Sequence, residues 1–250
     1  MSWVIITGAT SGIGLATAKL LAQKSYKLML LGRREDRLTT LKNELSKKTE
    51  VETFAFDLRD KKQVQDFVSQ ASLDRAEILI NNAGLARGVD NFQDAKLDDV
   101  DEMIETNVTA LLHLTRGVLP FMFKKNRGHI VNLGSVAGRI VYPKGAVYCA
   151  TKYAVRAISD GLRMDLLGTA IRVTNVEPGM VDTEFSEVRL RSKEKADKVY
   201  EGMKPLLAQD IAETIVWCLE RPAHVNIHEL VIYPTDQASV GQVHRTLTKS

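Results

Sequence analysis

The chain has 250 residues, of which 44% are hydrophobic and 26% are charged, and its formal net charge is +3. This composition is typical of a globular protein with a large core, and the small charge, without a long Lys/Arg run, argues against nucleic-acid binding. No stretch approaches the ~18–20 apolar residues of a membrane span, so we expect neither a membrane nor a nucleic acid as partner.

Apolar, β-branched runs alternate with helical patterns along the whole chain. Most of these runs are nearly continuous rather than alternating, which is typical of strands buried on both faces of a parallel sheet. In chain order the predicted strands are Val4–Thr7, Lys27–Leu31, Val51–Phe56, Ile78–Asn81, His129–Leu133, Ile171–Val176 and Glu229–Tyr233.

Helical patterns fill most of the connections. The β-α-β-α order predicts right-handed crossovers and a doubly wound, mostly parallel sheet of about seven strands with helices on both faces, a Rossmann-type α/β fold. The sequence has no internal repeat and no linker-like segment, so we expect a single domain over residues 1–250. The predicted helices are Ile13–Gln23, Asp36–Ser46, Lys62–Ser69, Asp98–Lys124, Ala146–Leu167 and Asp210–Leu219.

The segment from Phe185 to Pro205 breaks this rhythm. It follows a strand, is rich in Arg, Lys and Glu, and has no clear strand pattern. In such a fold it lies beyond the C-terminal edge of the sheet, where ligands bind. We expect either a substrate lid at residues 185–205 or a solvated pair of helices.

A glycine-rich turn follows the first strand. Its Gly-x-x-x-Gly-x-Gly spacing allows the backbone to approach a pyrophosphate, which the N-terminus of the next helix can bind through free N–H groups. Tight turns need glycine for steric reasons too, so the position directly after the first strand is what favours a dinucleotide site. The predicted cofactor contacts in the turn are Gly8, Thr10, Ser11, Gly12, Ile13 and Gly14.

The end of the second strand indicates which dinucleotide. NAD enzymes usually place an acidic residue there, which accepts a hydrogen bond from the ribose 2′-hydroxyl. Here Arg33 and Arg34 occupy this place, and a guanidinium matches a phosphate monoester in charge and geometry. As plain surface charges they would be disfavoured beside a helix N-terminus. We therefore expect NADP rather than NAD.

Tyr148 and Lys152 share one face at the start of a predicted helix. A fixed ammonium favours the phenolate, so it would lower the pKa of the tyrosine from about 10 toward the working range of a base. The same spacing recurs in Tyr200 and Lys204, but Gly202 and a following proline argue against a firm helix there. The first copy is the candidate.

Two further polar residues accompany this pair. Ser135 follows the strand His129–Leu133, where its hydroxyl can bind a substrate oxygen. Asn107 lies inside an otherwise apolar helix, and a buried polar group needs a partner, for which a held water is a candidate. The third and fourth strands end in Asp57-Leu58 and Asn81–Gly84, at the sheet edge where a dinucleotide would lie, although such residues also favour turns.

The cysteines, the histidines and the N-terminal residues argue against several further classes of protein. Cys149 and Cys218 are too few for a disulfide framework or a metal cluster, and the five histidines show no metal spacing. Met1-Ser2-Trp3 leads directly into an apolar segment, without the basic region and cleavage site of a secretion signal. We expect a cytoplasmic protein with no metal site.

In combination, these features resemble the short-chain dehydrogenase/reductase family over nearly the whole chain. The separation of thirteen residues between Ser135 and Tyr148 also agrees with that family. The matched features are Thr7–Gly14, Asn81–Gly84, Asn107, Ser135, Tyr148, Lys152 and Pro178-Gly179.

The resemblance implies a role for each of four residues. Tyr148 would be the general acid/base, Ser135 the hydrogen-bond donor to the substrate oxygen, Lys152 the ribose ligand that lowers the tyrosine pKa, and Asn107 the holder of a relay water. Besides the turn, Arg33, Arg34, Tyr148 and Lys152, the implied cofactor contacts are Asp57, Leu58, Asn81, Ala83, Gly84, Pro178, Gly179, Val181 and Thr183.

The family resemblance also implies a homotetramer packed through the long helices Asp98–Lys124 and Ala146–Leu167. A narrower resemblance, to the NADP-dependent 3-hydroxy acid dehydrogenases, implies a substrate class. That subfamily oxidises L-allo-threonine, L-serine and related 3-hydroxy acids such as 3-hydroxypropionate, and reduces 3-oxo acids such as malonic semialdehyde. The segments of this chain that resemble the subfamily are Glu177–Val181, Thr183–Ser186, Val188-Arg189 and Pro222–Ile227.

A substrate carboxylate calls for a guanidinium that can bind it bidentately. Arg139, four residues after Ser135, and Arg189, in the predicted lid, are the two candidates, and each can also be read as a solvated surface arginine.

Two other functions share parts of this pattern. An NADPH-dependent reductase of other small ketones, aldehydes or diketones would use the same catalytic residues. A non-catalytic NADP(H)-sensing protein would use the same fold, since fold alone does not fix function. A pure sensor has no chemical reason to keep Asn107, Ser135, Tyr148 and Lys152 together, so an enzyme is favoured.

Overall fold

The computed structural model describes residues 2–246. Its centre is a seven-stranded sheet with the order β3-β2-β1-β4-β5-β6-β9, and each neighbouring pair is parallel. The strand order reverses between β1 and β4, so these two strands flank the switch point where ligands bind in such sheets. The strands are β1 (Trp3–Thr7), β2 (Lys27–Gly32), β3 (Val51–Ala55), β4 (Ala76–Asn81), β5 (Gly128–Leu133), β6 (Ile171–Pro178) and β9 (Glu229–Ile232).

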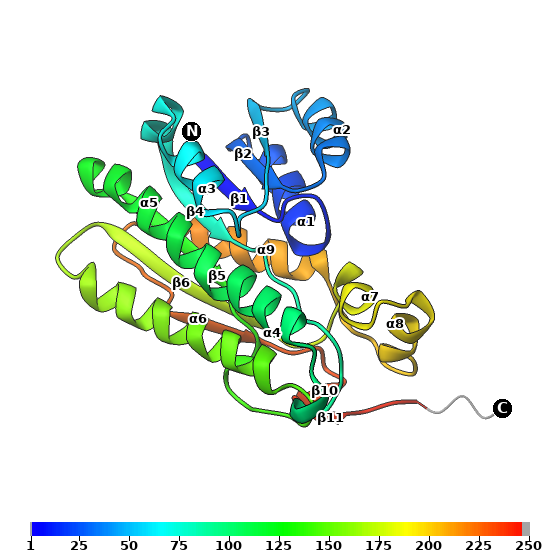
Figure 1. Cartoon of the computed structure of the whole chain (residues 1–250). Coiled ribbons are helices and arrows are strands. Elements are labelled where there is room, and N and C mark those ends of the chain that lie inside the picture. The colour runs from blue at the N-terminus through cyan, green and yellow to red at the C-terminus, as the bar shows by residue number, and fades with distance from the viewer. Residues whose placement is uncertain (1, 247–250) are drawn as a thin grey trace.

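Helices connect these strands, and the predicted doubly wound α/β fold is confirmed. The predicted strands and helices are present, most with ends shifted by one or two residues, except that the helix predicted over Asp98–Lys124 is interrupted. Figure 1 shows the helices arranged on both sides of the sheet. They are α1 (Gly12–Gln23), α2 (Glu35–Leu45), α3 (Lys61–Val68), α4 (Leu97–Ile104), α5 (Ala110–Lys125), α6 (Ala146–Asp165), α7 (Glu184–Leu190), α8 (Lys193–Val199) and α9 (Ala208–Leu219).

Alternate residues of each central strand enter two different cores. On β2, Leu28 and Leu30 pack under α1, α2 and α9, whereas Met29 and Leu31 pack on the opposite face under α3 and α5. All four side chains are buried. The strand therefore reads as a continuous apolar run because both of its faces are covered.

The long helix predicted over Asp98–Lys124 is interrupted. The structure has α4, then a π-turn at Glu105–Thr109, then α5. A π-turn accommodates one residue more than an α-helical turn and is frequent at functional sites. Asn107 lies in this π-turn and is buried.

The segment from Phe185 to Pro205 folds mainly as the pair α7 and α8. In Figure 1 this pair stands beyond the end of the sheet. Short strands on either side, β7 (Val181–Asp182) and β8 (Leu206–Leu207), pair in parallel, and β10 (Gln237–Ser239) pairs with β11 (Gln242–Val243). Sequence patterns did not predict these four strands, because two or three residues are too few to show a period.

Candidate active site

A cleft of about 670 Å³ opens along the carboxyl ends of the sheet strands. It is walled by the glycine-rich turn, the ends of β2, β4, β5 and β6, the start of α6, and the α7–α8 pair. This is the ligand-binding edge of a parallel α/β sheet. The predicted site residues that line the cleft are Gly8, Thr10, Ser11, Gly12, Ile13, Arg33, Arg34, Asp57, Leu58, Ala83, Gly84, Ser135, Tyr148, Lys152, Pro178, Gly179, Val181, Thr183 and Arg189.

The glycine-rich turn is held in a conformation that side chains would obstruct. Gly8 and Gly12 have φ values of +64° and +51°, in the left-handed region that favours glycine. A Cβ on Gly14 would lie 2.4 Å from both the Gly8 carbonyl oxygen and the Asn82 side-chain nitrogen. The backbone of the turn is therefore bare toward the cleft and packed tightly behind it, as a phosphate-binding turn requires.

One end of the cleft carries the two predicted arginines. Arg34 donates from Nε and Nη2 to the Thr10 hydroxyl at 3.1 and 3.0 Å, and from Nη1 to Glu184 at 2.9 Å. Arg33 Nη1 lies 3.8 Å from an Asp57 carboxylate oxygen. Burial opposes ionisation of Asp57, but hydrogen bonds from Arg59 outweigh it and hold the pKa of this carboxyl below its usual value. With guanidinium groups beside a bare turn, this end fits a phosphorylated nucleotide.

Asn81, the last residue of β4, and Asn82, which follows it, have different roles from those expected. Asn81 does not line the cleft. Its side-chain nitrogen donates to the Thr115 hydroxyl and to Asn132 Oδ1 in the protein interior, both at 2.9 Å. Asn82 instead lines the cleft, and it donates to the carbonyl oxygen of Thr7 at 2.8 Å. Alternation of side chains along a strand explains why only one of two neighbours can face the ligand.

Tyr148 and Lys152 occupy the opposite end of the cleft. Tyr148 lies in the first turn of α6 and forms a side-chain hydrogen bond with Ser135. Lys152 lies one turn later, with its Nζ 5.8 Å from the centre of the tyrosine ring, and donates to the Leu133 carbonyl oxygen at 2.7 Å. The structure thus brings together the predicted tyrosine, serine and lysine.

Asn107 lies behind these three residues rather than in the wall of the cleft. Its side-chain oxygen accepts from Leu85 N–H at 2.8 Å, and its nitrogen donates to the Leu85 carbonyl at 2.8 Å and to the Thr151 hydroxyl at 3.1 Å. Protein groups therefore supply partners for this buried amide, where the sequence suggested a held water. A Cβ on Gly84 would lie 3.2 Å from Asn107 Oδ1 and 3.7 Å from Lys152 Nζ, so Gly84 separates Asn107 from the lysine.

Burial is the largest influence on the pKa values of Tyr148 and Lys152. Burial raises the pKa of Tyr148 above 10, and Tyr142 adds to this, while the hydrogen bond with Ser135 and the charge of Arg189 act in the opposite direction. Burial also lowers the pKa of Lys152 to about 8, opposed by the carboxylate of Glu177. Lys152 is not among the groups that shift the pKa of Tyr148, so the expected lowering by the lysine is not seen, and burial keeps the phenol protonated at neutral pH.

The structure separates the two candidate substrate arginines. Arg189 lines the cleft, with its guanidinium 5.9 Å from the centre of the Tyr148 ring, and donates to the Tyr142 hydroxyl at 3.0 Å and to the Gly88 carbonyl at 3.1 Å. Arg139 does not line the cleft: it forms ion pairs with Glu177, which is fully buried, and with Glu229.

Sequence reasoning missed many residues of the wall, among them Asn82, Tyr142 and Phe185. Asn82 adjoins the motif residue Asn81, and alternation along the strand could have indicated it. Tyr142 precedes Tyr148 by six residues, and Phe185 lies at the start of the predicted lid with its ring centre 5.6 Å from that of Tyr148. No pattern in the sequence connects Phe185 to Tyr148, because only the tertiary fold brings α7 against α6.

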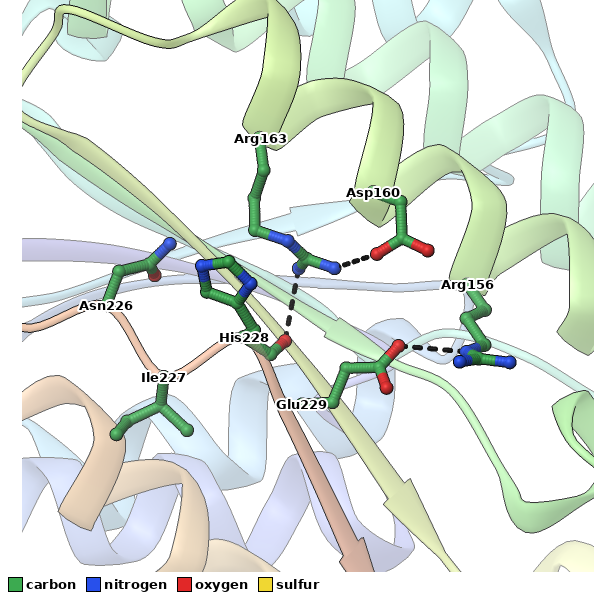
Figure 2. A pocket seen from close by; sticks show the side chains of 7 residues that line it. All are labelled: Arg156, Asp160, Arg163, Asn226, Ile227, His228 and Glu229. Carbon is green, nitrogen blue, oxygen red and sulfur yellow. Dashed lines mark hydrogen bonds and ion pairs between the residues drawn. The ribbon is translucent and has the colours of Figure 1, made fainter.

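A second pocket, of about 510 Å³, lies between α6 and the segment before β9. Figure 2 shows its charged side chains already paired: Arg163 with Asp160, and Arg156 with Glu229. His228 presents its backbone carbonyl to Arg163 at 3.1 Å. These contacts join the helix to the last strand of the sheet and leave this pocket without a catalytic arrangement.

Residues 2–246 show neither a membrane-spanning helix nor a cluster of metal ligands. No helix in this range is long and apolar enough to cross a membrane. The same residues include no group of three or more His, Cys, Asp or Glu side chains placed to hold a metal ion.

Comparison with known proteins gives consistent matches over the chain. The short chain dehydrogenase family model matches residues 2–194. The NADP-dependent 3-hydroxy acid dehydrogenase YdfG of Salmonella typhi is 43% identical over 248 residues, which cover 97% of this chain and 99% of that protein. Sulfoacetaldehyde reductase 2 of Chromohalobacter salexigens is 46% identical over 239 residues, covering 94% and 95%.

Among solved structures, the closed form of serine dehydrogenase complexed with NADP+ superposes with a TM-score of 0.91 at 41% identity. The match covers 98% of this chain and 100% of that one.

Proposed function

Since the chain belongs to the short-chain dehydrogenase family, we propose that it is an NADP(H)-dependent oxidoreductase of small 3-hydroxy and 3-oxo acids. One observation carries the substrate class: the Arg189 guanidinium lies in the cleft beside the ring of Tyr148, where it can bind a carboxylate while the tyrosine faces the reacting oxygen. The activities for which these relatives are named, and the NADP+ held by the serine dehydrogenase, support the same conclusion.

Different parts of the cleft would bind different parts of the cofactor. Gly8, Gly12 and the N-terminus of α1 would hold the pyrophosphate, and Arg33 and Arg34 the 2′-phosphate. When bound, the nicotinamide supplies or accepts the hydride.

In reduction, Tyr148 would donate its proton to the substrate oxygen while Ser135 hydrogen-bonds that oxygen, and in oxidation the proton returns to the tyrosine. Lys152 would bind the ribose and stabilise the phenolate. Asn107 Oδ1 accepts one hydrogen bond, from Leu85 N–H, and its second lone pair would hold a relay water between the lysine and solvent.

A specific observation favours a second substrate class. The sulfoacetaldehyde reductase is as similar to this chain as the hydroxy acid dehydrogenases are. A sulfonate presents the same negative charge and acceptor oxygens as a carboxylate, so Arg189 and Tyr142 could bind either group. The alternative is therefore an NADPH-dependent reductase of small aldehydes or ketones.

Initial rates test this proposal. We expect NADP+, and not NAD+, to be reduced with L-allo-threonine, L-serine or 3-hydroxypropionate. NADPH oxidation with sulfoacetaldehyde, without turnover of the hydroxy acids, would favour the reductase. Equal rates with NAD+ would contradict the assignment of Arg33 and Arg34.

We also propose that residues 1–250 act as one domain, with 185–205 as a lid, in a cytoplasmic homotetramer. Exposed apolar side chains on the long helices, such as Leu112 and Phe123 on α5 and Met164 on α6, support packing between copies. The two cysteines are free and buried, which suits a reducing compartment. Light scattering of the purified protein tests the tetramer.

A further inference from the structure

Glu184 links the predicted lid to the nucleotide end of the cleft. It lies in the first turn of α7, and its carboxylate accepts from Arg34 at 2.9 Å and from Arg37 at 2.6 Å. About 150 residues separate it from either arginine along the chain, so the contact depends on the tertiary fold. Its side chain is 41% exposed, so a ligand can reach this ion pair.

Arg34 is shared between the lid and the proposed 2′-phosphate site. Two of its guanidinium nitrogens donate to the Thr10 hydroxyl in the glycine-rich turn, and the third donates to Glu184. Arg37 Nη1 also lies 3.5 Å from the Thr10 carbonyl oxygen, so both arginines reach the same turn. A phosphate bound there would draw on guanidinium groups that already contact a carboxylate.

The arginines at this end of the cleft already contact carboxylates of the chain itself. Arg33 faces Asp57 and Glu102, at 3.8 and 4.0 Å, while Arg34 and Arg37 face Glu184. Burial works against the Glu184 carboxylate, but hydrogen bonds from Arg34 and Arg37 outweigh it and keep the pKa of Glu184 below its usual value. This carboxylate is therefore ionised at neutral pH.

We propose that Glu184 is an internal counter-ion that competes with a ligand 2′-phosphate for Arg34 and Arg37, and that Arg37 is a third arginine of this site. This inference rests on the proposed use of NADP(H). On this proposal the chain itself limits how tightly the cofactor binds, because a 2′-phosphate must displace the Glu184 carboxylate from Arg34 and Arg37.

Calorimetric titration with two adenine nucleotides tests the proposal without turnover. Adenosine 2′,5′-bisphosphate and 5′-AMP differ only in the 2′-phosphate. In Glu184→Gln, which keeps the shape and loses the charge, we expect the bisphosphate to bind about threefold to tenfold more tightly, since exposed ion pairs are weak. The gain for 5′-AMP should be smaller. Glu187→Gln, an exposed glutamate of the same helix, is the matched control and should leave both affinities unchanged.

The sign of the change decides between two roles for Glu184. Weaker binding of the bisphosphate to Glu184→Gln would mean that Glu184 helps to bind the ligand. Unchanged binding would mean that its contacts with the arginines do not affect the ligand. Either result overturns the proposal. The gain should also shrink between 0.05 and 0.5 M salt, because the competition is electrostatic.

The wild-type protein provides a separate check on the cofactor. If it binds the bisphosphate no better than 5′-AMP, the proposed preference for NADP fails. In that case, the direction in which Glu184→Gln changes the affinity for the bisphosphate still tests the role of Glu184.

Discussion

Replacing Arg139 by Met should destabilise the fold strongly, although the residue lies close to Ser135 in sequence. Arg139 pairs with Glu177, whose side chain is fully buried, and with Glu229. Without the guanidinium, Glu177 keeps only the hydrogen bond from Asn175 at 2.7 Å. Breaking a buried pair by removing one partner costs about 3–5 kcal/mol, because it leaves an uncompensated charge. At roughly 2–4 °C per kcal/mol for a chain of this size, the melting temperature should fall by about 6–20 °C.

Differential scanning calorimetry of single and double variants measures this loss. Glu177→Gln removes the buried charge, so the double variant Arg139→Met/Glu177→Gln should recover a large part of the stability lost in Arg139→Met. A melting temperature within about 2 °C of wild type for Arg139→Met would refute the reasoning, because it would mean that Glu177 has no need of its partner.

The pH dependence of the same variant has a defined sign. Burial already raises the pKa of Glu177 above its usual value of 4.5, although Arg139 opposes the rise. Loss of Arg139 should raise this pKa further, so the folded variant binds more protons than the unfolded chain. Its free energy of unfolding must then fall as pH rises from 4.5 through the raised pKa. The deficit relative to wild type should therefore be smaller at pH 5 than at pH 8.

Three predictions concern the reaction itself. Tyr148→Phe should lower turnover by about 10²–10⁴-fold while NADPH binding, followed by fluorescence, stays within about twofold; retained turnover would exclude the tyrosine as acid/base. Arg189→Met should raise KM for hydroxy acids about tenfold or more but leave KM for an uncharged alcohol nearly unchanged, and an equal rise for both substrates would remove Arg189 as the carboxylate ligand. Because the pKa of Lys152 is lowered to about 8, its ammonium is lost as pH rises through that value, so kcat/KM should decline above pH 8. A profile that stays flat to pH 10 would show that the reaction does not need the charged lysine.

The sheet and its ligand-binding edge could be predicted because they depend on local patterns. Apolar runs predict the seven main strands, and the glycine-rich turn needs no distant partner to be identified. The interruption at Glu105–Thr109 could not be predicted in this way. The apolar pattern continues through it, and the extra residue is stabilised by hydrogen bonds between Asn107 and Leu85, which is 22 residues away.

The two arginines show the same limit at the site. From sequence, Arg139 and Arg189 were equivalent candidates for the substrate carboxylate. The partners that separate them, Glu177 and Glu229 for one and Tyr142 and Gly88 for the other, lie on elements that only the folded chain brings near. Charge and spacing identify an arginine, whereas its role depends on which carboxylates it already contacts.

The π-turn absorbs one residue within the α4–α5 segment. Each residue of a regular α-helix turns the chain by about 100°, so an extra residue would rotate everything after it onto another face, whereas the π-turn takes up that residue without the rotation. Deleting one residue within Glu105–Thr109 would restore a regular helix and leave the buried faces of α4 and α5, with Met103 and Leu114, where they are. It would remove the widened turn from which Asn107 reaches Leu85. In homologous chains, a one-residue gap in this segment should therefore preserve the packing of both helices and mark a protein in which Asn107 no longer reaches Leu85.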